Sequence, residues 1–283
     1  MAFRTTPTNR TQEQMAKHHR KNLNSKVSVG EGVQSIRRTI SLIQEIAKNN
    51  HQGIRLSVLS KMVKIPVATV HRILSVLTSE RIIEHDSISK RYRLGFELYS
   101  LANKPYQLTV RDKYRTCLEH VAEKSQGSAY LLMRSGNDSI CVDCIDAKFP
   151  IRVVYDVGTR RPLGMGTAGL TLLSFLDKED IERVIKANSP RYAEYSRNLM
   201  AYEDYNKVTQ TEIRIAIERV RKLGYFFNEA MFLKNINGVG VPIFSSKGQP
   251  LGAISVTAPA GRISQTNSKE IAELIKSEIY LVR

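Results

Sequence analysis

The sequence predicts an α+β protein in which a winged helix-turn-helix precedes a larger domain built on a mostly antiparallel sheet. Three observations predict this class. Two short apolar helical sets lie a few residues apart and are followed by two strand-like runs around a polar turn. Beyond residue 128, strands and helices come in clusters and do not alternate strictly. Most of the excess positive charge lies in the first third of the chain.

The charge is divided unevenly along the chain. Of the formal net charge of +16, residues 1–104 hold 18 Lys and Arg against 7 Asp and Glu, a net of +11. Residues 105–283 hold 25 against 20, a net of +5. A basic excess concentrated in a small domain is typical of a protein with a polyanionic partner. We expect double-stranded DNA, although charge alone also fits a solubility role, a membrane surface or an acidic protein.

Composition bounds the class of protein. The 283 residues, 42% hydrophobic and 25% charged, fit one large or two ordinary globular domains and exclude a collagen or a fully disordered chain. The best candidate for a membrane span, Thr167 to Leu176, is about half the required length and contains Thr171 and Ser174. Three cysteines are too few for a disulfide framework, and the N-terminus lacks the apolar segment of a secretory signal. We expect a cytoplasmic protein with no membrane contact.

The N-terminal elements follow from apolar spacing. Residues 1–32 are basic and lack periodicity, which predicts a flexible arm. An amphipathic helix that ends near Asn50 is predicted next by six apolar residues at steps of three or four. These are Val33, Ile36, Ile40, Ile43, Ile46 and Ala47.

Two shorter helices and a hairpin follow. Apolar sets over Leu56–Val63 and Val70–Leu77 are joined through Pro66, which fits a first helical turn because its missing N–H costs nothing there. Strand-like runs at Ile82–His85 and Arg91–Gly95 surround a polar turn and form a wing. The sequence therefore predicts a winged helix-turn-helix DNA-binding domain over residues 33–95.

The second of these helices carries a face suited to the major groove. With Val70, Ile73, Leu74 and Leu77 turned inward, the opposite face presents a long cation, hydroxyls and a small side chain near the helix N-terminus. An ordinary solvated face is the alternative, and the short turn, the wing and the local charge favour DNA. The predicted contacts are Val67, Ala68, Thr69, His71, Arg72 and Ser75 of the helix, and Lys90, Arg91 and Arg93 of the wing.

Helices over Phe96–Ala102 and Val110–Lys124 flank Pro105, which predicts a linker into a second domain. Further strands and helices are then predicted along the chain. The strands are 129–133, 140–145, 151–154, 225–228, 239–244 and 253–257; the helices are 167–175, 178–187, 205–223 and one from Ser268.

Several segments resemble the IclR-type (isocitrate lyase regulator type) bacterial transcription factors. They cover nearly the whole chain after the arm and are Val33–Ile36, Leu56–Ile82, Arg91–Gly95, Val157–Leu163, Thr167–Ala168, Gly224–Tyr225 and Ala253–Thr257. The resemblance implies a linker helix over 96–112 and, over 113–283, a GAF-like effector-binding domain for a small organic acid. It also implies a homodimer or a dimer of dimers, located in the cytoplasm of a bacterium at its nucleoid.

The resemblance also implies residues for both sites. In the DNA-binding helix the family often has a basic and a hydroxyl residue where Val67 and Ala68 stand, which shifts readout toward Thr69, His71 and Arg72. Asn228 and Gly238 occupy positions that are commonly Asp and Cys in small-acid sensors, so the effector's identity stays open. The implied effector contacts are Thr167, Ala168, Asn228, Gly238, Ser255 and Thr257.

A physical argument supports an anion site at the same place. Gly164, Gly166 and Gly169 precede and enter an apolar helical run, where free backbone N–H groups attract a carboxylate. Ser255 and Thr257 alternate to one face of a strand and can meet the anion. The glycines can equally serve packing alone. They also spell G-x-G-x-x-G, but no buried strand precedes them directly, so a dinucleotide site is not expected.

Other chemistry finds little support. In the run Ile140–Ile145 strict alternation puts Cys141 and Cys144 on opposite faces, and no second pair of ligands lies nearby, so we expect core cysteines and no metal. No histidine follows His120, which removes the commonest general base from the larger domain. We expect no catalytic residues and no cofactor.

The sequence thus predicts a transcriptional regulator whose DNA binding is controlled by a small organic acid, and we favour repression over activation. The alternative is an enzyme that acts on a small metabolite and has an accessory basic domain.

Overall fold

The computed structural model of the protein describes residues 31–102, 105–147, 156–199 and 206–282. It divides the chain into two compact units, Met1–Lys104 and Pro105–Arg283. Residues 1–30 of the expected arm and the expected strand at 151–154 lie outside the described residues. No helix among the described residues is long and apolar enough to cross a membrane.

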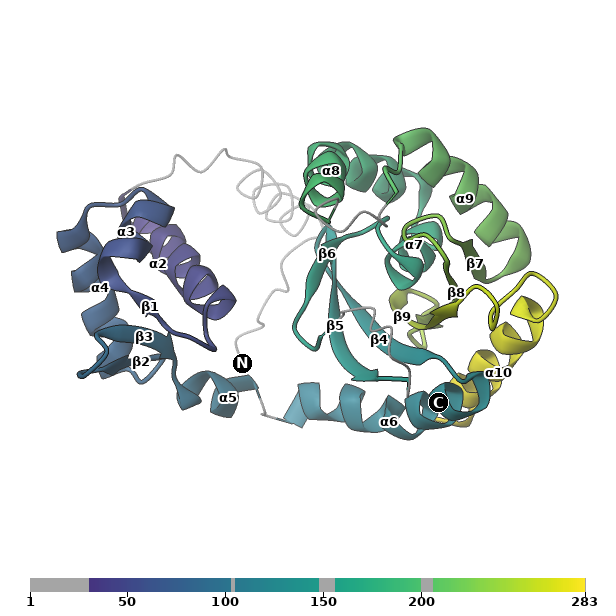
Figure 1. Ribbon diagram of the computed structural model, residues 1–283, viewed down its shortest axis with the longest axis horizontal. Helices are drawn as coiled ribbons and strands as arrows, with labels where there is room; N and C mark the ends of the chain where they lie inside the picture. Colours follow the sequence, from purple (N-terminus) through teal and green to yellow (C-terminus); the bar gives the residue numbers. More distant parts are fainter. Residues whose placement is uncertain (1–30, 103–104, 148–155, 200–205, 283) are drawn as a thin grey trace, which may run out of the picture. The chain divides into compact units, whose positions relative to one another are not determined.

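The first unit contains helices and a three-stranded antiparallel sheet of strand order β1-β3-β2 (Figure 1). This is the arrangement of a winged helix, with the β2–β3 hairpin as the wing. Its elements are α2 (Glu31–Lys48), β1 (Ile54–Arg55), α3 (Leu56–Val63), α4 (Val67–Ser79), β2 (Ile83–Asp86), β3 (Arg91–Leu94) and α5 (Phe96–Ala102).

The turn between α3 and α4 is short because the residue that ends α3 and the residue that caps α4 are only two positions apart. Lys64 adopts a left-handed conformation with φ of 54° and ends α3. Pro66 stands at the N-cap of α4, so the helix starts at Val67. Val70 and Leu74 of α4 are fully buried in the small core, as the helical wheel predicts.

Only part of the apolar set predicted for α2 is buried. Ile46 is fully buried, together with Leu42, whereas Ile36 and Ile40 are 60% and 49% exposed. Ile40 follows Ile36 by four residues and Val33 precedes Ile36 by three, so the three side chains lie on one face of the helix. The helix therefore presents an outward apolar stripe, formed by Val33, Ile36 and Ile40.

The second unit is an α+β structure built on a six-stranded antiparallel sheet of order β6-β5-β4-β9-β8-β7 (Figure 1). Its elements are α6 (Pro105–Ser125), β4 (Ser128–Ser135), β5 (Asp138–Ile145), β6 (Arg160–Pro162), α7 (Thr167–Ser174), α8 (Lys178–Leu199), α9 (Gln210–Leu223), β7 (Phe226–Glu229), β8 (Ile236–Phe244), β9 (Pro250–Pro259) and α10 (Ser268–Leu281).

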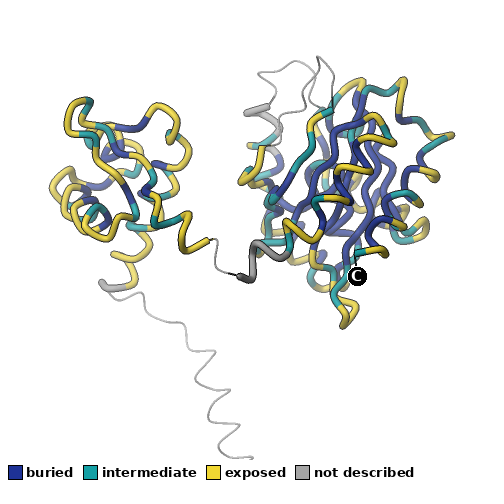
Figure 2. Tube along the Cα trace, turned by 90° about the horizontal axis from the view of Figure 1, so that it is seen from below, coloured by how far each residue is buried: buried dark blue, intermediate teal, exposed yellow. Residues whose placement is uncertain are grey.

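Both faces of this sheet are covered. Helices α7, α8 and α9 share one apolar cluster with the sheet, and α6 and α10 share another on the opposite face. Successive residues of β4 enter the two clusters in turn: Tyr130 and Leu132 the first, Ala129 and Leu131 the second. The strands accordingly appear buried along most of their length in Figure 2.

Some boundaries differ from those predicted. Helix α5 covers Phe96–Ala102 as predicted, whereas α6 starts at Pro105 and not at Val110; proline is favoured in a first helical turn. Helix α9 begins at Gln210 and not at Tyr205, because Thr209 and Glu212 form a capping box. Helix α8 continues to Leu199, well past the predicted end at Ala187.

The prediction that Cys141 and Cys144 lie on opposite faces is wrong. A β-bulge places Val142 and Asp143 together opposite Leu131, so the alternation of β5 shifts by one residue. Cys141 belongs to the cluster on the α7 face, and Cys144 packs against the same cluster.

The close approach of α7 to β8 requires glycine. A Cβ added at Gly240 would overlap Oγ1 of Thr171, and one at Gly238 would lie 2.6 Å from Oγ1 of Thr167. Both threonines belong to α7, so the two glycines determine how closely the helix packs on the sheet.

We predict that Gly240→Ala lowers the free energy of unfolding of the second unit by about 1–3 kcal/mol, because the added methyl overpacks the α7–β8 contact. Urea denaturation measures the change. Gly261→Ala is the control, because its Cβ meets nothing within 4 Å. Equal destabilisation of the two variants would contradict the packing role.

Candidate functional site

The outward face of α4 carries the side chains predicted to contact DNA. Val67, Ala68, His71, Arg72 and Ser75 are exposed, and Thr69 is half-buried. The Ser75 hydroxyl donates to the carbonyl of His71 at 2.9 Å and keeps its lone pairs available as acceptors. The face therefore combines a guanidinium, an imidazole and hydroxyls on one exposed helix.

A groove runs between α2 and α4 and brings a further cation to this surface. Thr69 and Arg72 of α4 line it together with Arg38 and Thr39 of α2. Arg38 was not predicted, because its position on α2 reads as an ordinary solvated residue. Its place beside Arg72 becomes visible only once the two helices are packed.

The three wing cations differ in their surroundings. Lys90 and Arg93 are exposed. Arg91 is half-buried, and its Nη1 donates to the carbonyls of Gln52 at 3.3 Å and Gly53 at 2.8 Å. Arg91 thus joins the wing to the loop before α3.

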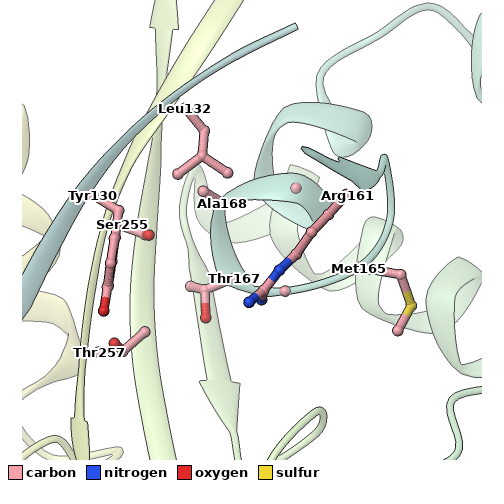
Figure 3. A pocket seen from close by; sticks show the side chains of 10 residues that line it. Tyr130, Leu132, Arg161, Met165, Thr167, Ala168, Ser255 and Thr257 are labelled. Atoms are coloured by element: carbon pink, nitrogen blue, oxygen red, sulfur yellow. The ribbon is translucent and has the colours of Figure 1, made fainter. Parts of the chain in front are cut away.

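The second unit contains a pocket between the sheet and the N-terminus of α7 (Figure 3). Four of the six predicted effector contacts line it: Thr167 and Ala168 from α7, and Ser255 and Thr257 from β9. Tyr130 and Leu132 of β4, Arg161 of β6, Met165, Gly166 and Gly169 complete the lining.

Asn228 and Gly238 lie behind Thr167 and are absent from this set of lining residues. The Asn228 side-chain amide donates to Oγ1 of Thr167 at 3.1 Å, and its Oδ1 accepts from the N–H of Met231 at 3.0 Å. Gly238 leaves the room that Thr167 needs. Both residues therefore support the position of Thr167 in the pocket wall.

Arg161 gives the pocket its charge. The side chain is only 8% exposed, and it extends toward Thr167 in Figure 3. Its Cζ lies 5.6 Å from the ring centroid of Tyr195, on α8. Among the described residues that line the pocket, Arg161 supplies a positive charge. A guanidinium in a buried pocket wall is suited to charge-assisted hydrogen bonds with an anion.

Two further features suit an anion. Gly166, the N-cap of α7, supplies no side-chain cap, so the positive end of the helix faces the pocket without one. Burial raises the pKa of Tyr130 to about 12, so its phenol remains protonated and can donate a hydrogen bond. The pocket thus offers donors to a negatively charged group.

Neither a metal site nor a thiol nucleophile is found at the pocket. Over the described ranges no three or more His, Cys, Asp or Glu side chains are grouped so as to hold a metal ion. Burial raises the pKa of the Cys141 thiol to about 12, which keeps it protonated and unreactive.

Comparison with known proteins identifies the larger unit. Residues 106–278 match the family model described as "Bacterial transcriptional regulator IclR C-terminal". The chain belongs to the IclR family of bacterial transcriptional regulators. The expectation from the sequence motifs is confirmed.

Curated relatives extend over both units. The HTH-type transcriptional repressor AllR of Escherichia coli K12 is 22% identical over 246 residues, which are 87% of this chain and 87% of AllR. The HTH-type transcriptional regulator KipR of Bacillus subtilis 168 is 26% identical over 225 residues, which are 79% of this chain and 86% of KipR. These relatives are transcriptional regulators by name.

Solved structures share the fold. An IclR homologue from Microbacterium hydrocarbonoxydans, complexed with 4-hydroxybenzoate, superposes with a TM-score of 0.71 at 21% identity and covers 87% of this chain and 99% of its own. The Thermotoga maritima IclR superposes with a TM-score of 0.60 at 17% identity, over 88% and 97%. The predicted fold class, α+β with a mostly antiparallel sheet, agrees with these IclR structures.

Proposed function

We propose that this IclR-family regulator binds specific DNA through α4 and the wing, and that a small organic anion in the pocket of the second unit controls this binding. The observation that carries the proposal is the buried guanidinium of Arg161 beside the uncapped N-terminus of α7. A regulator needs no catalytic group there, and the lining residues that the structure describes include no His, Cys, Asp or Glu.

In this proposal α4 enters the major groove. Arg72 and His71 contact base edges, and the hydroxyls of Thr69 and Ser75 contact bases or phosphates. Val67 and Ala68 offer apolar contact to thymine methyl groups. Lys90 and Arg93 bind phosphates from the wing, while Arg91 keeps the wing in place through its bonds to the loop before α3. Arg38 adds a phosphate contact beside α4.

The proposed effector is a carboxylate with a compact apolar body. Its negative group pairs with Arg161 and receives hydrogen bonds from hydroxyls of Ser255, Thr257 or Tyr130. Leu132 and Met165 surround the apolar part. The Microbacterium homologue was crystallised with 4-hydroxybenzoate, which belongs to this class. Aromatic monocarboxylates are therefore the first ligands to test.

We further propose that the chain acts as a repressor and as a dimer. AllR is named as a repressor, which favours the same direction here. The exposed apolar stripe of α2, Val33, Ile36 and Ile40, is suited to pair with a second copy, because exposed apolar side chains in a row mark association surfaces. Two paired DNA-binding units read two half-sites and add their binding energies.

Arg72→Ala should reduce the difference in binding free energy between specific and non-specific DNA by about 1–3 kcal/mol, because the variant loses a base-edge contact. Fluorescence anisotropy with a duplex selected from a random pool by the wild-type protein measures this. Lys48→Ala, which also removes one exposed cation, is the control for charge. Unchanged discrimination in Arg72→Ala would reject α4 as the reading helix.

Benzoate and 4-hydroxybenzoate should raise the melting temperature of the wild-type protein, whereas benzamide and 4-hydroxybenzamide should not, because only the acids pair with Arg161. Arg161→Gln should lose this rise, and Arg219→Gln, an exposed arginine on α9, should keep it. An equal rise with the amides, or an undiminished rise in Arg161→Gln, would contradict the anion pocket.

Ile36→Glu should convert a dimer to a monomer in analytical ultracentrifugation, because a charge would be buried in the paired α2 stripes. Ile88→Glu places the same charge on a 93% exposed wing residue and should leave the mass unchanged. A dimeric Ile36→Glu variant would exclude the stripe from the interface.

A further inference from the structure

The β-bulge of β5 lies directly behind the wall of the pocket. Tyr130 and Leu132, which line the pocket, pair across the sheet with Cys144 and Cys141, the residues on either side of the bulge. Between them, Leu131 lies opposite Asp143 and faces the other side of the sheet. One extra residue in β5 therefore places a carboxylate behind the pocket wall.

Asp143 connects β5 to helix α6. Its side chain is only 1% exposed, and its Oδ1 accepts from Nη1 of Arg115 at 3.0 Å. Nε of Arg111 lies 3.4 Å from the same oxygen. Oδ1 also accepts from the N–H of Cys144 at 3.0 Å, within the bulge itself. Both arginines belong to α6, so a single buried oxygen joins the bulge to two successive turns of that helix.

Helix α6 is the segment through which the chain enters the effector unit. It begins at Pro105, the first residue of the second unit, and only residues 103–104 separate it from α5 of the DNA-binding unit. A shift of α6 along or about its axis therefore moves the end of the helix to which the chain from the first unit is attached. Asp143 contacts both α6 and the bulge behind the pocket wall, so it links such a shift to the wall.

We propose that Asp143 is a positioning residue that couples occupancy of the pocket to the position of α6, through Arg111 and Arg115. This rests on the proposed function, because coupling requires both an effector and DNA. The pocket-facing residues of β4, Tyr130 and Leu132, move with a bound anion, the paired bulge of β5 moves with them, and Asp143 passes the movement to α6. Asp143 itself touches no ligand.

The contacts of Asp143 allow two arrangements. Its Oδ2 is buried and accepts no hydrogen bond, while Oδ1 receives every donor. The guanidinium of Arg115 is divided, since Nε donates to Glu119 at 2.9 Å and Nη1 donates to Asp143. A small movement of α6 brings a second arginine N–H to Oδ2 at the expense of Glu119. A carboxylate with one satisfied and one bare oxygen is thus suited to a two-state contact.

The chain provides its own reporter for a test that needs no effector. Coupling is reciprocal, so DNA binding must also change the pocket wall. Cys144 is half-buried and flanks the bulge, whereas Cys117 and Cys141 are only 1% and 0% exposed. The rate at which iodoacetamide alkylates Cys144 in the full-length protein reports on the exposure of the pocket wall. Mass spectrometry locates the alkylated cysteine, with and without the selected DNA duplex.

For the wild-type protein we expect saturating duplex to change the alkylation rate of Cys144 by about threefold or more, and for Asp143→Asn we expect no change beyond the error. Asparagine keeps the acceptor for the Cys144 N–H but loses the charge. Asp112→Asn makes the same change on an exposed residue of α6 and should behave as the wild type. Arg111→Gln with Arg115→Gln breaks the contact from the α6 side and should behave as Asp143→Asn.

A wild-type protein that binds the duplex with no change at Cys144 would overturn the coupling while leaving DNA binding intact. An undiminished DNA effect in Asp143→Asn, or in the double arginine variant, would overturn the role of Asp143. Circular dichroism melting shows that each variant is folded before labelling. A wild-type protein that binds no selected duplex would overturn the proposed function and the coupling together.

Discussion

The close packing of α7 on β8 is the constraint on which the pocket of the second unit depends. Gly238 and Gly240 allow Thr167 and Thr171 to approach the sheet, and this approach brings the N-terminus of α7 beside β9. With a Cβ at either glycine the helix would move outward, and the hydroxyls of Ser255 and Thr257 would no longer meet the helix terminus across one small pocket. The close packing thus determines the electrostatics of the pocket, because it places the positive N-terminal end of α7 and the guanidinium of Arg161 in the same pocket wall.

Charge is used differently in the two units. In the first unit the cations lie on exposed surfaces of α4 and the wing, where they attract a polyanion and yet retain their hydration. In the second unit the net charge is small, but Arg161 is buried, so one cation has a larger effect than several exposed ones. The chain's overall charge of +16 therefore says little about the effector, and the position of a single arginine says more.

Local signals predicted the elements that bury one regular face. The sets around Leu56–Val63 and Val70–Leu77, with Pro66 between them, were sufficient for the winged helix, and Ser255 and Thr257 share a pocket face because strand alternation is strict there. Arg161 was not predicted as a pocket residue, because β6 has only three residues and is too short to show an alternation of buried and exposed side chains. Cys141 and Cys144 were assigned to opposite faces of the sheet, because the residues of β5 give no sign of the bulge that shifts its alternation. The division of α2 into buried and exposed apolar residues depends on how many neighbours the helix has, which spacing cannot tell.

If an anion in the second unit changes the affinity of the first unit for DNA, the dissociation constant of the full-length protein for its selected duplex must change when a carboxylate binds. We expect a saturating carboxylate that raises the melting temperature to change this dissociation constant by about fivefold or more, the usual lower bound for coupling between two sites. An unchanged dissociation constant, with calorimetry showing the carboxylate bound, would contradict it.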